Sequence, residues 1–304
     1  MGAAALRSDR YPTRDKARLW RLTPYLYVLP CVAAYFVLAF IPLLQTGWIS
    51  LHEWDGIGDP VWVGLDNFKD IFTDPEIRSS FAHALFLILF YTILPVSLGL
   101  LLAALLMRVA FRTATFFRVV LFLPFTISLV VVAVSWQWIY APQGPLNAVL
   151  DAVGLDGLSR GWLGDFTFAL PAVGLTATWV TFGFPLVLFI AGMAKIPASL
   201  YDAARIDGAG FVREFFAVTL PALRNELLIA VGFTIITALR TFALLYVMTQ
   251  GGPGSATRVP AVDIYERAFV QFQVGSAAAI GVMLTVLIFL VIVAITYAFE
   301  RGQE

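Results

Sequence analysis

The segment 199–223 carries charged residues in a sequence that is otherwise strongly apolar. It reads SLYDAARIDGAGFVREFFAVTLPAL and places two acids, Asp202 and Asp207, on either side of Arg205. Charges on a short helix that also has an apolar face are typical of a surface that docks into a groove on another protein. The chemistry that this segment offers is therefore recognition of a partner.

The sequence contains none of the common catalytic or metal-binding patterns. It has no GxxxxGK[ST] phosphate loop, no HExxH helix and no CxxC pair. The two histidines, His52 and His83, are isolated near the ends of apolar runs, and we expect them to be packing or interfacial residues. The one cysteine, Cys31, excludes an intrachain disulfide. We therefore expect no enzyme activity, no metal site and no cofactor on this chain, so any chemical energy must come from another polypeptide.

Two short helices joined by a glycine are expected to position the charges of 199–223. Pro197 suits the first turn of a helix, because its missing N–H costs little there, and the residues 198–207 favour or tolerate helix. Gly208 permits the left-handed backbone that ends a helix and redirects the chain. A second helix through 211–218 is followed by Pro221. An amphipathic helix that only rests on lipid headgroups is the alternative, although two acids and a glycine elbow fit a protein groove better.

Composition places the chain in a lipid bilayer. Hydrophobic residues make up 60% of the sequence and charged residues 13%, and the mean hydropathy is +0.85, far from the balance of a soluble domain. The first apolar run, from Tyr25 to Ser50, exceeds the about 7–15 residues of a signal-peptide core, so we expect it to remain as a span. A helix needs about 20 apolar residues to cross the hydrocarbon core. The sequence therefore predicts an all-α membrane protein with six transmembrane helices, at about 25–50, 81–107, 118–140, 167–193, 226–250 and 276–298.

Basic residues predict the orientation, because cytoplasmic loops retain lysine and arginine during insertion. Fourteen of them fall on the side that holds both termini and the segment 199–223, and five fall on the other side. We therefore expect the N and C termini to be cytoplasmic. The expected parts are a cytoplasmic segment 1–24, a transmembrane domain 25–298 with its cytoplasmic loop 194–225, and a cytoplasmic tail 299–304.

The charged segment resembles the inner-membrane permease subunits of ABC importers, in the carbohydrate-uptake branch that includes the maltose-type permeases. The cytoplasmic signature of that family runs Glu-Ala-Ala, then Gly, and further on Ile/Thr-Leu-Pro; here the matching stretch is DAARIDGAGFVREFFAVTLP. Asp202 stands where the family usually has glutamate, which shortens the acid by one methylene group. Other stretches, such as YLYVLPCVAAYFVLAFIPLLQTGWISL and LLYVMTQGGPGSATRVPAVDIYERAF, extend the resemblance to the compact six-span members over the whole chain.

The resemblance implies the type I ABC importer permease fold in a bacterial inner membrane. In that family two homologous permease subunits enclose the pathway, two ATPase subunits bind ATP and Mg²⁺, and an extracytoplasmic binding protein delivers the solute; lipid surrounds the permease and nucleic acid has no part. It also implies that 199–210 form the coupling helix, which sits in a cleft of an ATPase subunit. The coupling residues expected on this basis are Asp202, Ala203, Ala204, Arg205, Asp207, Gly208, Ala209 and Gly210.

Arg240 is the one formally charged residue near the middle of an expected span. A charge at that depth is costly, and it usually faces an internal cavity or a partner. Arg240 could bind solute hydroxyls or a phosphate, or it could fix the interface with the second permease; both interpretations stay open. The other expected pathway residues have aromatic, hydroxyl or amide side chains: Trp179, Thr181, Thr234, Thr237, Tyr246 and Gln250.

The resemblance favours a disaccharide or oligosaccharide as the solute. A glycerophosphate or glycerophosphodiester is the alternative, since Arg240 could neutralise a phosphate. A secondary transporter is a more distant alternative, because no Asp or Glu lies at mid-depth in the expected spans to couple an ion.

The glycine-rich stretch TQGGPGSATR, 249–258, is not a nucleotide loop, since it has no lysine in the phosphate position. We expect it to form an outer turn that closes over the pathway or contacts the binding protein. Five prolines inside the expected spans predict kinks: Pro42, Pro95, Pro124, Pro171 and Pro185.

Overall fold

The computed structural model describes residues 14–301, so residues 1–13 of the expected N-terminal segment and 302–304 of the expected tail lie outside it. The chain forms two units, of which the first ends at Trp48 and the second begins at Ile49. The first unit holds α1 (Arg14–Tyr35), the π-helical turn η1 (Phe36–Phe40) and most of α2 (Ile41–Ile49), which follow one another without a break. The stretch Tyr25–Ile49 is long and apolar enough to cross a membrane, which matches the first expected span.

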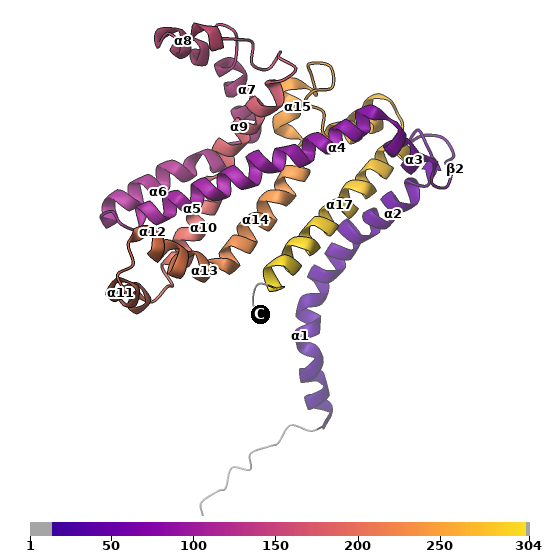
Figure 1. Ribbon diagram of the computed structural model, residues 1–304. Helices are drawn as coiled ribbons and strands as arrows, with labels where there is room; N and C mark the ends of the chain where they lie inside the picture. Colours follow the sequence, from indigo (N-terminus) through magenta and orange to yellow (C-terminus); the bar gives the residue numbers. More distant parts are fainter. Residues whose placement is uncertain (1–13, 302–304) are drawn as a thin grey trace, which may run out of the picture. The chain divides into compact units, whose positions relative to one another are not determined.

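The second unit is a helical bundle with one small hairpin (Figure 1). Its elements are β1 (His52–Glu53), β2 (Val61–Trp62), α3 (Asp66–Thr73), α4 (Pro75–Ile88), η2 (Leu89–Ile93), α5 (Leu94–Leu106), α6 (Phe111–Thr126), α7 (Leu129–Ile139), α8 (Pro145–Ala152), η3 (Asp156–Leu158), α9 (Ala169–Thr181), α10 (Gly183–Met193), α11 (Ala198–Ile206), α12 (Phe211–Glu214), η4 (Phe215–Thr219), α13 (Leu220–Ala222), α14 (Arg224–Leu239), α15 (Ala243–Thr249), α16 (Pro260–Tyr265), η5 (Glu266–Val270) and α17 (Val274–Arg301).

Six membrane spans are reached only when two bent helix pairs are counted as one span each. Three helices of the second unit are each long and apolar enough to cross a membrane: Pro75–Leu106, Ala169–Met193 and Val274–Phe299. The bent pairs are Arg112–Thr126 with Leu129–Ile139, at 95°, and Phe211–Ala222 with Arg224–Leu239, at 73°. With Tyr25–Ile49 the described residues therefore hold four to six spans.

Two expected spans are not continuous helices. The third, 118–140, bends near Pro124, where a kink was expected: α6 ends two residues after this proline, and Ile127 is extended, with ψ of 142°, before α7 begins. The fifth, 226–250, is broken, because α14 ends at Leu239 and α15 begins only at Ala243. Neither glycine nor proline causes the second break. Within the break, the buried hydroxyl of Thr241 lies 2.7 Å from the hydroxyl of Tyr91, a residue of another helix.

Three prolines lie two residues after a π-helical turn: Pro42 after η1, Pro95 after η2 and Pro221 after η4. Proline has no N–H, and its ring clashes with the carbonyl four residues before it. The wider π-helical turn removes this conflict. In each case the residue before the proline donates its N–H to the carbonyl five residues earlier: Ile41 to Phe36, Leu94 to Leu89, and Leu220 to Phe215.

Close packing between α5 and α10 holds the centre of the second unit together. A Cβ added at Gly99 of α5 would lie 2.8 Å from the backbone nitrogen of Leu186 and 2.9 Å from Cβ of Pro185, so only glycine allows these helices to approach so closely. The hydroxyl of Thr178 on α9 donates to the carbonyl of Phe90 at 2.6 Å. Leu186 of α10 also shares a buried cluster with Ala230 of α14, so the helices before and after the charged segment belong to one packed core.

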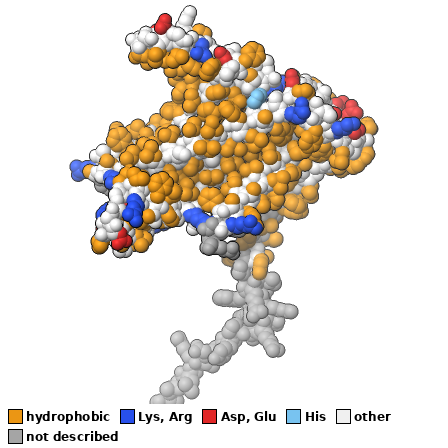
Figure 2. Space-filling view, viewed as in Figure 1, with side chains coloured by type: hydrophobic (Ala, Val, Ile, Leu, Met, Phe, Trp, Pro, Cys, Tyr) orange, Lys and Arg blue, Asp and Glu red, His pale blue; other side chains and the backbone are white. Residues whose placement is uncertain are grey.

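The outer surface of the second unit shows the pattern of a membrane protein. Figure 2 shows hydrophobic side chains over the middle of the face in view, with Lys, Arg, Asp and Glu gathered toward its ends. Large exposed apolar side chains include Leu101, Val131, Phe289 and Leu290. Such a band is expected where lipid, and not water, surrounds the helices.

A hairpin that the sequence did not predict lies at the end opposite α11. Strands β1 and β2 are antiparallel, with His52 opposite Trp62. The side-chain amide of Asn67 donates to the carbonyls of Ser50, at 3.0 Å, and His52, at 2.9 Å. His52 is buried and its ring meets the ring of Trp62 edge-on, so it packs the hairpin, as expected for an isolated histidine.

Candidate functional site

The first part of the charged segment forms helix α11, which ends in a hydrogen-bonded turn at Gly208. Gly208 has φ of +75°, the left-handed region that glycine adopts most readily. The N–H of Gly208 donates to the carbonyl of Arg205 at 3.0 Å, and the N–H of Ala209 donates to the carbonyl of Ala204 at 2.9 Å. These two bonds make a Schellman motif. A Cβ at Gly208 would have nothing within 4 Å, so the glycine is required by the backbone angle and not by lack of space.

Helix α11 has no buried residue. Asp202, Ala203, Asp207 and Gly208 are exposed, and Ile206 is 86% exposed. Leu200 of the same helix is exposed as well, at 49%, so α11 leaves apolar and charged side chains uncovered together. Figure 1 shows α11 and α12 together at one end of the second unit, away from α8.

Of the remaining expected coupling residues, Ala204 and Ala209 are half-buried and Gly210 is exposed. The two acids differ in their surroundings. Asp202 already pairs with Arg205, at 3.3 Å within the helix, whereas Asp207 forms no ion pair with any residue that the structure describes. Asp207 is therefore the acid that is free to meet a partner.

Between α11, α12 and the ends of α5 and α10 lies a cavity of about 420 Å³ that the sequence did not predict. Its wall includes Arg108, Tyr201, Arg205, Phe211 and Glu214. Glu214 is buried and is the acid that joins the two arginines: Arg205 Nε lies 3.4 Å from one carboxylate oxygen, and Arg108 Nη2 lies 3.6 Å from the other. The sequence does carry a signal for it, since Glu214 is an acid inside the apolar stretch FVREFFAV.

A second cavity, of about 510 Å³, lies where α14 breaks. It brings together three of the expected pathway residues, Thr181, Thr237 and Arg240. Aromatic rings complete much of its wall: Tyr91 of η2, Phe125 of α6, Phe233 of α14 and Phe242 of the break. The break in the fifth span thus opens a chamber with one cation, several hydroxyl groups and aromatic faces.

Arg240 is exposed, and its guanidinium forms no hydrogen bond or ion pair with any residue between 14 and 301. It sits directly after the last residue of α14, Leu239. The hydroxyl of Thr237 donates to its own helix, to the carbonyl of Phe233 at 2.8 Å. The guanidinium of Arg240 therefore has bonding capacity to spare in this wall.

The other four expected pathway residues do not line this cavity. Thr234 is fully buried and donates to the carbonyl of Ala230 at 2.8 Å. Trp179 is 38% exposed and meets the ring of Trp136 edge-on. Gln250 caps α15 in the left-handed region.

Tyr246 is separated from the cavity by one ring. It stacks on Phe242, with the ring centroids 5.0 Å apart and an interplanar angle of 17°, and Phe242 lines the cavity. Tyr246 also meets the ring of Tyr265 at 5.0 Å. Its contacts therefore join the cavity wall to α16.

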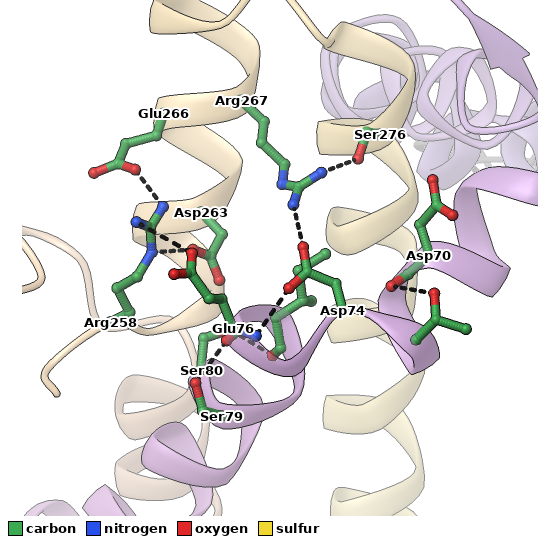
Figure 3. A network of polar contacts seen from close by, with 12 residues as sticks. Asp70, Asp74, Glu76, Ser79, Ser80, Arg258, Asp263, Glu266, Arg267 and Ser276 are labelled. Carbon is green, nitrogen blue, oxygen red and sulfur yellow. Dashed lines mark hydrogen bonds and ion pairs between the residues drawn. The ribbon is translucent and has the colours of Figure 1, made fainter. Parts of the chain in front are cut away.

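A charged network lies at the end opposite α11 and fixes the segment after the glycine-rich loop (Figure 3). Arg258 pairs with Asp263 at 2.7 Å and also with Glu266. Arg267 donates to Asp74 and to Ser276, at 2.9 Å each. The network thus ties α16, η5 and α17 to the beginning of α4.

Burial acts on both members of the Arg258–Asp263 pair. Burial raises the pKa of Asp263 above its usual range, although hydrogen bonds from Ser80 and Arg258 act in the opposite direction. For Arg258, burial disfavours the charge, but Asp263, Glu266 and Glu76 outweigh it and raise the pKa. His83 joins the same loop, since its Nδ1 lies 2.8 Å from the carbonyl of Arg258, so His83 also has a structural contact.

The glycine-rich stretch 249–258 is closed on itself. The hydroxyl of Thr257 donates to the carbonyl of Gly252 at 2.7 Å, and it lies 2.7 Å from the hydroxyl of Thr249. Within the described part of the chain, no group of three or more His, Cys, Asp or Glu residues could hold a metal ion.

Comparison with known proteins gives consistent results. Residues 95–303 match the family described as binding-protein-dependent transport system inner membrane component. The probable ABC transporter permease protein YurN of Bacillus subtilis is 33% identical over 287 residues, which cover 93% of this chain and 98% of YurN. The diacetylchitobiose uptake system permease protein NgcF of Streptomyces coelicolor is also 33% identical, over 96% of this chain and 87% of NgcF.

A solved structure has the same fold. It belongs to a bacterial ABC transporter involved in the import of the acidic polysaccharide alginate, and it superposes with a TM-score of 0.80 at 21% identity. The match covers 96% of this chain and 99% of that chain.

Proposed function

Because the chain belongs to the family of binding-protein-dependent transport system inner membrane components, we propose that it forms half of the pathway through which an ATP-driven importer takes up a sugar. As a member of this family it is a multi-pass inner-membrane permease and not an enzyme. A second permease would form the other half of the pathway. An extracytoplasmic binding protein would deliver the solute.

Helix α11 is the proposed coupling helix, and it would dock in a cleft of an ATPase subunit that holds ATP and Mg²⁺. The observation that carries this proposal is that α11 has no buried residue and yet ends in a fixed turn at Gly208. A rigid exposed helix can pass on a rigid-body movement that a mobile loop would absorb. The end of the second unit that bears α11 would then face the cytoplasm, together with both termini.

The cavity beside Arg240 is the proposed solute site, and a disaccharide or oligosaccharide is the proposed solute. Ligand sites commonly combine apolar and aromatic walls with a few placed polar groups, and this wall combines Phe125, Phe233 and Phe242 with the hydroxyls of Thr181 and Thr237. A relative that is 33% identical is named for diacetylchitobiose uptake, which supports the same choice.

A glycerophosphate or glycerophosphodiester is the second candidate solute. The unpaired guanidinium of Arg240 favours it, since arginine binds phosphate oxygens strongly. A neutral sugar would use Arg240 only as a hydrogen-bond donor to hydroxyl groups.

Two measurements test the proposal. The complete transporter, reconstituted with its second permease, its ATPase subunits and its binding protein, should hydrolyse ATP faster when the binding protein is loaded with a sugar from a panel that also contains glycerol 3-phosphate. A crosslinker on Ile206→Cys, in a Cys31→Ser background, should capture an ATPase subunit, whereas one on Val149→Cys of α8 should not. Capture only from Val149→Cys would overturn the assigned orientation, and stimulation by glycerol 3-phosphate alone would select the second solute.

A further inference from the structure

A buried carboxylate connects the proposed coupling helix to a second membrane span. The Glu214 side chain is only 10% exposed, and its two oxygens meet guanidinium groups from two different elements. Arg205 belongs to α11, whereas Arg108 follows the last turn of α5. Removing Glu214 would take the shared partner from both arginines, whereas removing one arginine leaves the buried carboxylate with a single partner.

Arg108 is fixed from a second direction. Its guanidinium carbon lies 3.9 Å from the centre of the Phe211 ring, a cation–π contact with α12. The cavity of about 420 Å³ separates much of α11 from the span ends. The link between α11 and the end of α5 is therefore made through Glu214 and Arg108 and not through close packing.

The span that ends beside Arg108 is long, and ion pairs hold its opposite end. The stretch Pro75–Leu106, formed by α4, η2 and α5, is 32 residues long. Near its outer end, Asp74 accepts from Arg267 at 2.9 Å, and Glu76 lies 4.0 Å from Arg258 (Figure 3). The helical segment Pro75–Leu106 thus connects the Glu214–Arg108 salt bridge at one end to the network that fixes α16 and the glycine-rich loop at the other.

We propose that Glu214 and Arg108 are positioning residues that make α5 move together with the coupling helix. The helical segment Pro75–Leu106 then transmits part of the movement of the ATPase subunits to the outer loop. This inference rests on the proposed docking of α11 to an ATPase subunit. Without the Arg205–Glu214–Arg108 bridge, the movement would reach α10 and α14, which the chain joins to α11, and it would reach α5 only through the packing of α5 against α10.

The experiment measures whether α11 and the end of α5 keep their separation when the ATPase subunits close. Nitroxide labels are placed at Ile206→Cys and Val109→Cys, both exposed, in the complete transporter with Cys31→Ser. Their distance is measured by pulsed EPR without nucleotide and after trapping with ATP and vanadate. We expect equal distances in the two states for the otherwise unchanged chain, and a shift on trapping in Glu214→Gln and in Arg108→Met. Arg108→Lys, which keeps the charge, should restore equal distances.

Glu226→Gln is the matched control. Glu226 is 14% exposed and pairs with Lys195 at 3.2 Å, so this variant neutralises a carboxylate of similar burial without touching the bridge. A distance shift in Glu226→Gln, or no shift in both Glu214→Gln and Arg108→Met, would overturn the inference. If Glu214→Gln does not assemble, Arg108→Met decides alone, since Arg108 is half exposed.

The failure of the proposed function would look different. If the mobility of a label at Ile206→Cys stays unchanged when the ATPase subunits are added, α11 does not dock on them. That result would contradict the proposed function and, with it, this inference. An immobilised label with unaltered distances in the variants would overturn this inference alone.

Discussion

The hydroxyl of Tyr91 lies 2.7 Å from the hydroxyl of Thr241, and both side chains are buried. Tyr91 belongs to η2 of the second span, whereas Thr241 lies in the break between α14 and α15, next to Arg240. The contact therefore ties the break that forms the proposed solute cavity to a different helix.

Thr241→Val should destabilise the protein by about 1–3 kcal/mol, because it leaves the buried hydroxyl of Tyr91 without a partner. Thermal unfolding in detergent measures this loss. The double variant with Tyr91→Phe removes both hydroxyls, so we expect it to be less destabilised than the sum of the single variants. Simple additivity would show that the two hydroxyls do not interact.

Gly208→Ala should cost about 1–2 kcal/mol, because alanine is strained at a left-handed backbone angle. It should also lower binding-protein-stimulated ATP hydrolysis, since the end of α11 would no longer be fixed. Gly154 is the matched control: it has φ of +79° and, as at Gly208, a Cβ there would have nothing within 4 Å. Gly154→Ala should lose similar stability and keep its ATPase stimulation, and Gly210→Ala, which has open space without a positive φ, should change stability least.

Arg240→Ala should raise the KM for a phosphate-bearing solute about tenfold or more, which corresponds to about 1.4 kcal/mol of lost binding. Uptake of a neutral sugar should change less, since only a hydrogen-bond donor is lost. Arg240→Lys should recover most of the phosphate affinity. An unchanged KM together with a lower yield of the complex would instead place Arg240 at the interface with the second permease.

The start of α9 should loosen in acid because of Asp165. The N–H groups of Thr167 and Phe168 donate to its carboxylate, at 2.8 and 3.1 Å, and hold the pKa of Asp165 below its usual value. A depressed pKa means that the stabilisation is complete above the usual value of 3.8 and is lost as the pH falls through the lower folded pKa. Hydrogen exchange at Thr167 and Phe168 should show protection falling in that range, and Asp165→Asn should remove the pH dependence. Unchanged protection in acid would contradict this assignment.

The sequence by itself determined the class of the molecule and the position of its charged helix. Apolar runs are local, so Tyr25–Ile49 and Val274–Phe299 follow directly from composition. The turn at Gly208 is equally local, because the left-handed backbone angle depends on one residue and on hydrogen bonds within the neighbouring turn. The family resemblance at 202–221 came from the same short stretch.

Only the tertiary structure decided which residues share a site. Glu214 became the centre of a bridge because α5 and α11, which are distant in sequence, bring Arg108 and Arg205 to it. The fifth span breaks at Arg240 although hydropathy runs through that region, and within the break Thr241 contacts Tyr91, 150 residues away. Of the seven expected pathway residues, the three that meet in the cavity beside this break are Thr181, Thr237 and Arg240. A hydropathy window adds up neighbours along the chain, whereas a cavity wall is made by helices that meet in space.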